Sequence, residues 1–207
     1  MKLYEIFLTL HGESSFAGVP TTLVRLGECN LRCHYCDTKY AYQYKFIKSV
    51  DEIVEQIKEN APIKNVLITG GEPLLQKKEV IDLSKKLLKQ NYEVLLETNG
   101  SFSIQGLPRK THIILDLKTP SSGECEKNNY QNLNFLSKND ELKFIIGDEN
   151  DYKWSKAILE KYRIKVGEVL FSSVYGKLDS KILAQWILRD KLTVRLQMQI
   201  HKILNIK

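Results

Sequence analysis

Three of the four cysteines lie within eight residues, at Cys29, Cys33 and Cys36, whereas Cys125 is far away in the sequence. The C-x3-C-x2-C spacing on a predicted loop allows three thiolates to converge, and thiolates are ligands for zinc, copper(I) and iron-sulfur clusters. A structural zinc site needs a fourth ligand, for which Cys125 and His34 are the candidates. A four-iron four-sulfur cubane with three cysteines instead leaves one iron open to a small molecule. We favour the cluster and interpret Cys125 as a free thiol.

Two further segments carry polar groups to places where predicted strands end. Thr69-Gly70-Gly71-Glu72-Pro73 follows one strand, and its paired glycines allow a close backbone approach while Glu72 or nearby carbonyls accept hydrogen bonds from an ammonium group. Arg25 stands in an otherwise apolar strand four residues before the cysteine cluster, where a guanidinium suits a bidentate grip on a substrate carboxylate. The alternative for Arg25 is an ion pair at the rim of the sheet.

The hydrophobic pattern that must position these groups alternates between strand-like and helix-like segments. A helix is predicted after Ser49, where Glu52 completes a capping box, and its apolar face repeats at helical spacing. The other predicted helices are 77–90, 151–162 and 180–189, the last with Ile182 in its core-facing stripe. The predicted strands are 4–10, 21–26, 65–69, 93–97, 112–117, 141–146, 169–173 and 194–200. This order predicts one α/β domain with a largely parallel sheet, either barrel-like or open, whose ligands bind at the carboxyl ends of the strands.

Composition excludes several classes of protein. The 207 residues suffice to bury about 70% of the unfolded surface, and the 43% hydrophobic and 27% charged content is typical of a globular domain. The net charge of +6 is interpreted as solvated helix faces, so we expect no direct nucleic-acid partner. No apolar run approaches the roughly 18 residues of a membrane span, and the first residues do not resemble a secretory signal. We therefore expect a cytoplasmic protein without a membrane partner.

The string Cys29 to Cys36 resembles the signature of the radical S-adenosylmethionine (SAM) enzymes, and the segment Thr69 to Pro73 resembles their GGEP motif. Within that superfamily, Phe7 to Glu13 and Cys36-Asp37-Thr38 are similar to the pattern of the 7-carboxy-7-deazaguanine synthase (QueE) family. The match continues through 97–100, 118–123 and the late Gln197-x-Gln199-x-His201-Lys202. The resemblance implies one radical SAM core domain over residues 1–207, folded as an incomplete TIM-like barrel.

The resemblance also implies an activity. The enzyme would be a carbon-nitrogen lyase that converts 6-carboxy-5,6,7,8-tetrahydropterin to 7-carboxy-7-deazaguanine with release of ammonia, on the route to queuosine and other deazapurines. Its cofactors would be a 4Fe-4S cluster, SAM and Mg²⁺, and the cluster would cleave SAM to a 5'-deoxyadenosyl radical. Its partners would be an electron donor such as flavodoxin or ferredoxin and a second copy in a homodimer. The alternatives are a radical SAM activase that makes a glycyl radical on another protein and a structural zinc-binding module.

The resemblance assigns site residues position by position, with no catalytic residue beyond the cluster. The expected cluster ligands are the three clustered cysteines, and the expected magnesium ligand is Thr38. The expected substrate-binding residues are Leu10, His11, Gly12, Arg25 and Thr69. The expected SAM-binding residues are Tyr35, Cys36, Asp37, Gly71, Asp116, Leu117, Lys118, Ser172 and Ser173. The sequence departs from the family pattern at three places: His11 replaces a usual Gln, Ser14 a common Gly, and Glu28 the Gly that precedes the first cysteine.

Overall fold

The computed structural model describes residues 1–206, and nine strands of this part of the chain form one curved sheet in the order β3-β1-β2-β4-β5-β6-β7-β8-β9. Strands β2 and β4 to β9 run parallel, whereas β1 pairs antiparallel with both β2 and β3. The two edge strands do not pair with each other, so the barrel is incomplete. The strands are β1 (Lys2–Leu10), β2 (Pro20–Leu26), β3 (Phe46–Ile47), β4 (Asn65–Gly70), β5 (Glu93–Thr98), β6 (His112–Leu117), β7 (Glu141–Ile146), β8 (Glu168–Ser173) and β9 (Arg195–Gln197).

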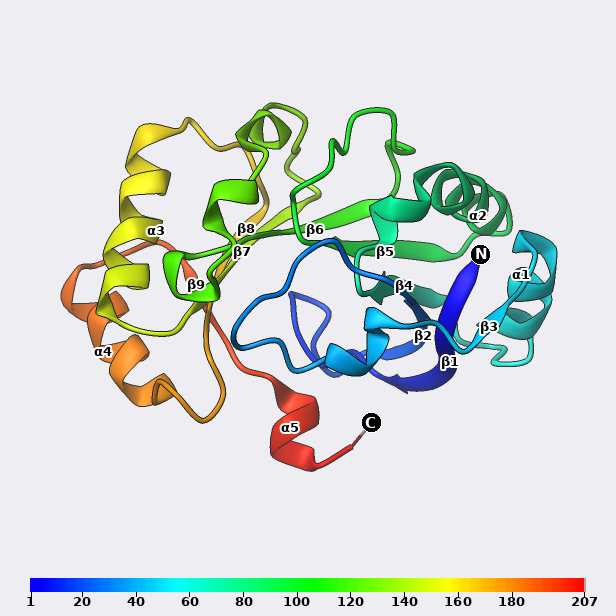
Figure 1. Cartoon of the computed structure of the whole chain (residues 1–207), viewed down its shortest axis with the longest axis horizontal. Coiled ribbons are helices and arrows are strands. Elements are labelled where there is room, and N and C mark those ends of the chain that lie inside the picture. Colours follow the sequence, from blue (N-terminus) through cyan, green and yellow to red (C-terminus); the bar gives the residue numbers. More distant parts are fainter. Residues whose placement is uncertain (207) are drawn as a thin grey trace.

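Helices connect several of the strands and lie outside the sheet, with α1 and α2 toward one end and α3 and α4 toward the other (Figure 1). The predicted capping box is confirmed at the start of α1, where the Ser49 side chain accepts from the Glu52 N–H and the Glu52 carboxylate accepts from the Ser49 N–H. The helices are α1 (Val50–Lys58), α2 (Lys77–Lys89), α3 (Glu149–Lys161), α4 (Ser180–Arg189) and α5 (Ile200–Leu204).

The period of two along each strand separates a helix-covered face from an inner face. On the outer face, Val24, Ile68, Leu96 and Leu115 are fully buried against apolar side chains of the helices. This large core holds the sheet in its curvature. Complete burial of one such side chain contributes roughly 1.5–3 kcal/mol.

The inner face is arranged in two layers. The lower layer is a small apolar cluster of Leu67, Leu95 and Ile114, against which Leu23 and Phe16 pack. Above it, two residues further along the strands, stand polar side chains, as the register pairs Arg25 with Thr69 and Asp116 with Lys143. The polar side chains therefore project from regular strands, directly above a packed apolar layer that fixes the position of those strands.

Most predicted elements are confirmed, but two expectations are wrong in detail and one short strand was missed. The strand expected over 194–200 is only three residues long, and the chain then turns into the short helix α5. Ile182, expected in the core stripe of α4, is 40% exposed, while Leu183 beside it is fully buried. The short strand β3 was not predicted, because two residues give no periodic signal.

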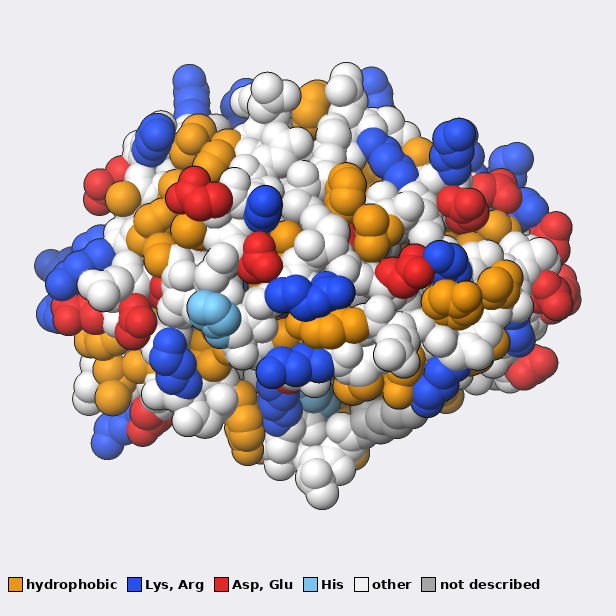
Figure 2. Space-filling model, in the orientation of Figure 1, with side chains coloured by type: hydrophobic (Ala, Val, Ile, Leu, Met, Phe, Trp, Pro, Cys, Tyr) orange, Lys and Arg blue, Asp and Glu red, His pale blue; other side chains and the backbone are white. Residues whose placement is uncertain are grey.

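The charged side chains on the surface fit the interpretation of the net charge as solvated faces. Lys and Arg side chains are interspersed with Asp and Glu on the face shown in Figure 2. Among the described residues, no helix has both the length and the apolar character that crossing a membrane requires.

Candidate active site

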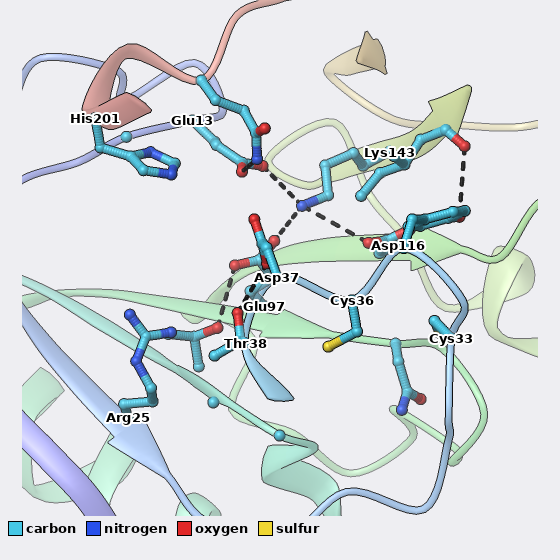
Figure 3. Close-up of a pocket in the computed structure, with 18 of the residues that line it drawn as sticks. Glu13, Arg25, Cys33, Cys36, Asp37, Thr38, Glu97, Asp116, Lys143 and His201 are labelled. Carbon is cyan, nitrogen blue, oxygen red and sulfur yellow. Dashed lines mark hydrogen bonds and ion pairs between the residues drawn. The ribbon is translucent and has the colours of Figure 1, made fainter. Parts of the chain in front are cut away.

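A cavity of about 620 Å³ opens at the carboxyl ends of the parallel strands. It brings together most of the residues that the sequence predicts for the site, from both halves of the chain (Figure 3). The predicted residues that line it are Leu10, His11, Gly12, Arg25, Cys29, Cys33, Tyr35, Cys36, Asp37, Thr38, Thr69, Gly71, Asp116, Lys118 and Ser173. Leu117 and Ser172 do not line it.

The cluster loop, residues 28–38, lies directly on Gly71. A Cβ atom at Gly71 would stand 2.0 Å from the Glu28 carbonyl oxygen and 3.0 Å from Cys29 Cβ, so only glycine fits beneath the loop. The Glu72 N–H donates to the same Glu28 carbonyl at 2.8 Å. The two sequence motifs therefore form one structural unit, although about forty residues separate them.

The three thiols fit a sulfur-ligated cluster by their chemistry and placement. All three are partly buried and face the same cavity. Cys29 Sγ accepts from the Leu31 N–H at 3.4 Å and from Asn99 Nδ2 at 3.9 Å. Burial raises the pKa of the Cys29 thiol, and it raises the pKa of Cys33 to about 11. In a protein without metal Cys29 and Cys33 are therefore thiols, and binding of a cationic cluster would stabilise their thiolate form.

Of the two candidates for a fourth zinc ligand, His34 lines the cavity with the three cysteines, whereas Cys125 does not. Within residues 1–206, no group of three or more His, Cys, Asp and Glu side chains is arranged to hold a single metal ion. Cys125 lies outside the cavity on the turn η4 (Cys125–Lys127), and its Sγ contacts Glu126. The prediction that Cys125 is a free thiol is consistent with this placement.

Glu72 has a structural role. Its side chain is fully buried and accepts from the Leu74 N–H at 2.8 Å, Thr98 Oγ1 at 2.7 Å and the Asn99 N–H at 2.7 Å. The carboxylate thus joins the end of β4 to the end of β5 and does not line the cavity. The sequence suggested either Glu72 or nearby carbonyls as acceptors for an ammonium group. Because Glu72 does not line the cavity, only the carbonyls can have that role.

Arg25 lines the cavity and also forms the ion pair that was its alternative interpretation. Its Nε donates to Glu5 Oε1 at 2.8 Å, and its guanidinium lies over the ring of Tyr40 at 5.6 Å. The pair is mostly buried, with 15% of the Arg25 side chain and 11% of the Glu5 side chain exposed. An Nε contact fixes the plane of the guanidinium and leaves its terminal fork for another partner.

Thr38 and Asp37 lie where the cluster loop meets the end of the chain. Thr38 Oγ1 donates to Asp37 Oδ1 at 2.9 Å, while Lys202 Nζ donates to Asp37 Oδ2 at 2.5 Å. The hydroxyl oxygen of Thr38 keeps its lone pairs, so Thr38 and Asp37 together offer hard oxygen donors.

The residues predicted for SAM divide into two groups. Asp116 and Lys118 form an ion pair of 3.0 Å at the end of β6 and line the cavity with Tyr35. Leu117 between them is fully buried in the helix-covered core, because alternate strand residues face opposite ways. On β8, Ser173 lines the cavity and hydrogen-bonds to Ser180, whereas Ser172 lies buried beside β9.

His11 and Gly12 begin the loop that follows β1. His11 is 3% exposed, and its Nδ1 accepts from the Glu13 N–H at 3.3 Å, which places the proton of the neutral ring on Nε2. Burial lowers the pKa of His11. Gly12 lies against the ring of His201 in α5, and a Cβ there would stand 2.0 Å from His201 Nδ1, so a larger residue would have to displace that ring.

The structure adds residues that the sequence did not assign. Lys143, on β7, is 3% exposed and contacts the carboxylates of Glu13, Glu97 and Asp116. The signal for Lys143 was present, since a single lysine in a strand of buried apolar residues needs an ionic partner. The segment from Gln199 to Ile206 also contributes to a wall of the cavity. The predicted strand 194–200 ran too far and hid the turn into this segment. Lys207, the last residue of the chain, lies outside the described residues.

Two of the departures from the family pattern adopt left-handed backbone. Ser14 has φ 63° and Glu28 has φ 73°, a region that favours glycine. The family pattern has glycine at these two positions because glycine adopts left-handed backbone without strain. This chain accepts the strain at both places and gains side-chain contacts, since Ser14 Oγ accepts from the Phe16 N–H and Glu28 pairs with Lys2.

Comparisons with known proteins agree with this geometry. The family description "Radical SAM superfamily" matches residues 24–178. The chain is 38% identical to a 7-carboxy-7-deazaguanine synthase of Koribacter versatilis, over 98% of this chain and 96% of the relative. It is 40% identical to one of Chlorobaculum tepidum, over 98% of this chain and 93% of the relative. Its fold resembles the crystal structure of QueE from Escherichia coli, with a TM-score of 0.79, 22% identity and coverage of 96% and 93% of the two chains.

Proposed function

Because the chain belongs to the radical SAM superfamily and, within it, to the 7-carboxy-7-deazaguanine synthase family, we propose that it converts 6-carboxy-5,6,7,8-tetrahydropterin to 7-carboxy-7-deazaguanine with release of ammonia. The observation that carries the proposal is that the thiols of Cys29, Cys33 and Cys36 share one cavity with Arg25. A cluster site and a group suited to an anionic substrate thus face the same space.

The cluster and SAM, when bound, supply the one-electron cleavage and the hydrogen abstraction that start the reaction. The three cysteines would hold the cluster in the cavity, and the backbone of Gly71, which lines the cavity with them, would contact SAM. Tyr35, Asp37, Asp116 and Lys118 would contact SAM through their side chains, with Ser173 at the far wall. Leu117 is left with main-chain contacts, because its side chain is buried in the helix-covered core. Ser172, whose side chain does not line the cavity, would also contact SAM through its main chain.

The protein's own groups would orient the pterin. The guanidinium of Arg25, held by Glu5, would bind the carboxylate at C6. Thr69, Leu10, His11 and Gly12 would frame the ring, with the Nε2 proton of His11 as a donor. Holding both reactants in a closed space lowers the entropic part of the barrier and excludes water.

The other half of the pterin carries N–H donors on its pyrimidine ring, and these need acceptors. The carboxylates of Glu13 and Glu97 line the cavity, and carboxylate oxygens accept more than one hydrogen bond each. Burial opposes ionisation of Glu97, but the charge and hydrogen bond of Lys143 hold the pKa of this carboxyl below its usual value. Glu97 would therefore bind the pyrimidine edge as a carboxylate, with Glu13 beside it as a second acceptor.

A magnesium ion would bind next to Thr38, whose hydroxyl lies beside the Asp37 carboxylate. The ammonium group of Lys202 on the other Asp37 oxygen lowers the local negative charge, so Mg²⁺ would bind weakly before substrate oxygens join it. The remaining assignments are one radical SAM core domain over residues 1–207, a cytoplasmic location, a flavodoxin- or ferredoxin-like electron donor and a homodimer.

The test is an anaerobic incubation of the reconstituted protein with SAM, a reductant and the carboxypterin. Formation of 7-carboxy-7-deazaguanine and ammonia supports the proposal. SAM cleavage that instead generates a glycyl radical on another protein would favour the activase. Colourless protein with one zinc per chain would favour the zinc-binding module. Either outcome without the deazaguanine product overturns the proposal.

A further inference from the structure

Lys143 occupies the centre of the cavity floor. It stands on the inner face of β7, beside Asp116 in the register of the parallel strands β6 and β7. Its ammonium group lies 2.9 Å from Glu13 Oε2 and 3.7 Å from Asp116 Oδ2, and it also contacts Glu97 Oε1 (Figure 3). The three carboxylates come from three different elements: the loop after β1, strand β5 and strand β6.

Two of the three N–H donors of Lys143 are used in hydrogen bonds, to Glu13 Oε2 at 2.9 Å and to Glu97 Oε1. Asp116 adds an ion pair at 3.7 Å. Only 3% of the Lys143 side chain is exposed. Its strongest contacts are therefore with the two carboxylates, through which it would act on a bound molecule.

Each of the two outer carboxylates is fixed from a second side. Gln199 Nε2 donates to Glu13 Oε1 at 2.5 Å, and Thr69 Oγ1 donates to Glu97 Oε2 at 3.1 Å. Without the lysine, Glu13, Glu97 and Asp116 would face one another as three anions, with the Lys118 ammonium on Asp116 as the nearest other cation. Like charges at such separation move apart or take up a proton.

We propose that Lys143 is a positioning residue for the carboxypterin: it holds the carboxylates of Glu13 and Glu97 at a fixed separation, where they accept hydrogen bonds from the N–H groups of the pyrimidine ring. This inference rests on the proposed function. Burial by itself disfavours the charged form of Lys143, but the three carboxylates outweigh it and hold its pKa well above the usual value. The charged and titratable groups that face this cluster are Glu13, Glu97, Asp116, Lys118, His11 and Asp37.

The test compares Lys143→Met with the wild-type holoenzyme. We expect the iron content and the SAM cleavage measured without pterin to stay within twofold of wild type, whereas the KM for the carboxypterin rises at least tenfold. We also expect the acidic limb of the kcat/KM profile to move to higher pH by about one unit, because carboxylates without their cation take up protons more readily. Lys143→Arg, which keeps the charge, should recover part of the loss in KM.

Lys156→Met is the matched control, since Lys156 pairs with Asp190 at 2.5 Å and does not line the cavity. It should leave KM and the pH profile unchanged. A Lys143→Met enzyme with wild-type KM and acidic limb overturns the inference, even if its kcat or melting temperature falls. Equal changes in the Lys156→Met enzyme also overturn it.

A second comparison serves if Lys143→Met does not fold. Glu97→Gln and the double variant Glu97→Gln with Lys143→Met differ only in the lysine, and the double variant lacks one buried cation and one buried anion. We expect the double variant to have a KM at least threefold above that of Glu97→Gln, because without Lys143 the carboxylate of Glu13 is no longer held in place. Equal KM values overturn the inference. Absence of deazaguanine product from the wild-type enzyme overturns the proposed function, and with it this inference.

Discussion

Lys202 and Asp37, which are 165 positions apart in the chain, form an ion pair of 2.5 Å at the edge of the cavity. The contact joins the helix α5 to the cluster loop. A second contact joins α5 to the loop after β1, where the Ile200 N–H donates to the Gly12 carbonyl at 3.0 Å. The carboxyl-terminal segment therefore belongs to the site, although its own sequence is short and mostly apolar.

Replacement of Lys202 tests the magnesium assignment. Lys202→Met removes a cation beside Thr38 and frees one oxygen of Asp37, so the Mg²⁺ concentration for half-maximal turnover should fall about 2- to 10-fold. Titration of turnover with Mg²⁺ measures this. Lys39→Met removes a charge from the neighbouring exposed turn and should change the value little. An unchanged or raised Mg²⁺ requirement in Lys202→Met contradicts the assignment.

Loss of one cluster ligand should abolish the cluster. Cys33→Ala should reduce iron from about four per chain to a small fraction and abolish SAM cleavage, because two thiolates do not retain a cubane. Cys125→Ala is the matched control, since Cys125 lies outside the cavity. Iron analysis and the visible absorption of anaerobic protein decide the outcome. A Cys33→Ala protein with full iron content would show that the assigned ligands are wrong.

Arg25 should matter to the substrate and not to the cluster. Arg25→Gln should keep the iron and the substrate-independent cleavage of SAM, and its kcat/KM for the carboxypterin should fall about 10- to 100-fold, as expected for loss of charged hydrogen bonds. Glu5→Gln breaks the same ion pair from the other side and should reduce kcat/KM less. If both variants lose the same activity and the same stability, Arg25 serves only the ion pair.

Backbone strain at Glu28 predicts a stabilising substitution. Glu28→Gly relieves a φ of 73° and loses a half-exposed ion pair with Lys2. Removing left-handed strain contributes about 1 kcal/mol, and an exposed pair contributes about 0–1 kcal/mol. The free energy of unfolding should therefore stay equal or rise by up to about 1 kcal/mol in urea titrations. A loss of more than about 1 kcal/mol would show that the left-handed backbone carries no strain here.

The free energy of unfolding should depend on pH through Glu141, which lies at the start of β7. Its carboxylate is 1% exposed, accepts from the backbone and hydroxyl of Ser15, and lies 3.2 Å from His112 Nε2. Burial opposes ionisation, but the His112 and Ser15 contacts hold the pKa of Glu141 below its usual value. A lowered carboxyl pKa stabilises the fold above the unfolded value of about 4.5, and this contribution is lost as pH falls through the folded value.

The comparison of wild type with Glu141→Gln measures this contribution. Near pH 7, the variant should be less stable by about 1–3 kcal/mol, since it loses a charged acceptor in a buried position. The difference should shrink as pH falls below about 4.5. Urea unfolding at pH 7, 5 and 4 gives the three values. A difference that does not change with pH would exclude ionisation of Glu141 as the cause.

The sequence by itself predicted the cluster site and determined most of the elements that carry it. C-x3-C-x2-C and Thr69-Gly70-Gly71-Glu72-Pro73 are local patterns, and strands and helices follow from periods of 2 and 3.6 that a short segment displays. The position of Arg25, a charge inside an apolar strand, was also a local signal.

Tertiary structure decided which of these groups meet. Lys143 contacts Glu13 across 130 positions and Glu97 across 46, and no local pattern fixes such pairings. Strand register places Leu117 in the core and Asp116 in the cavity. Packing buries Glu72, which the sequence offered as a ligand, and its carboxylate hydrogen-bonds the end of β5 to the end of β4. The physical reason is that a side chain's direction follows from its own strand, whereas its partners follow from the curvature of the whole sheet.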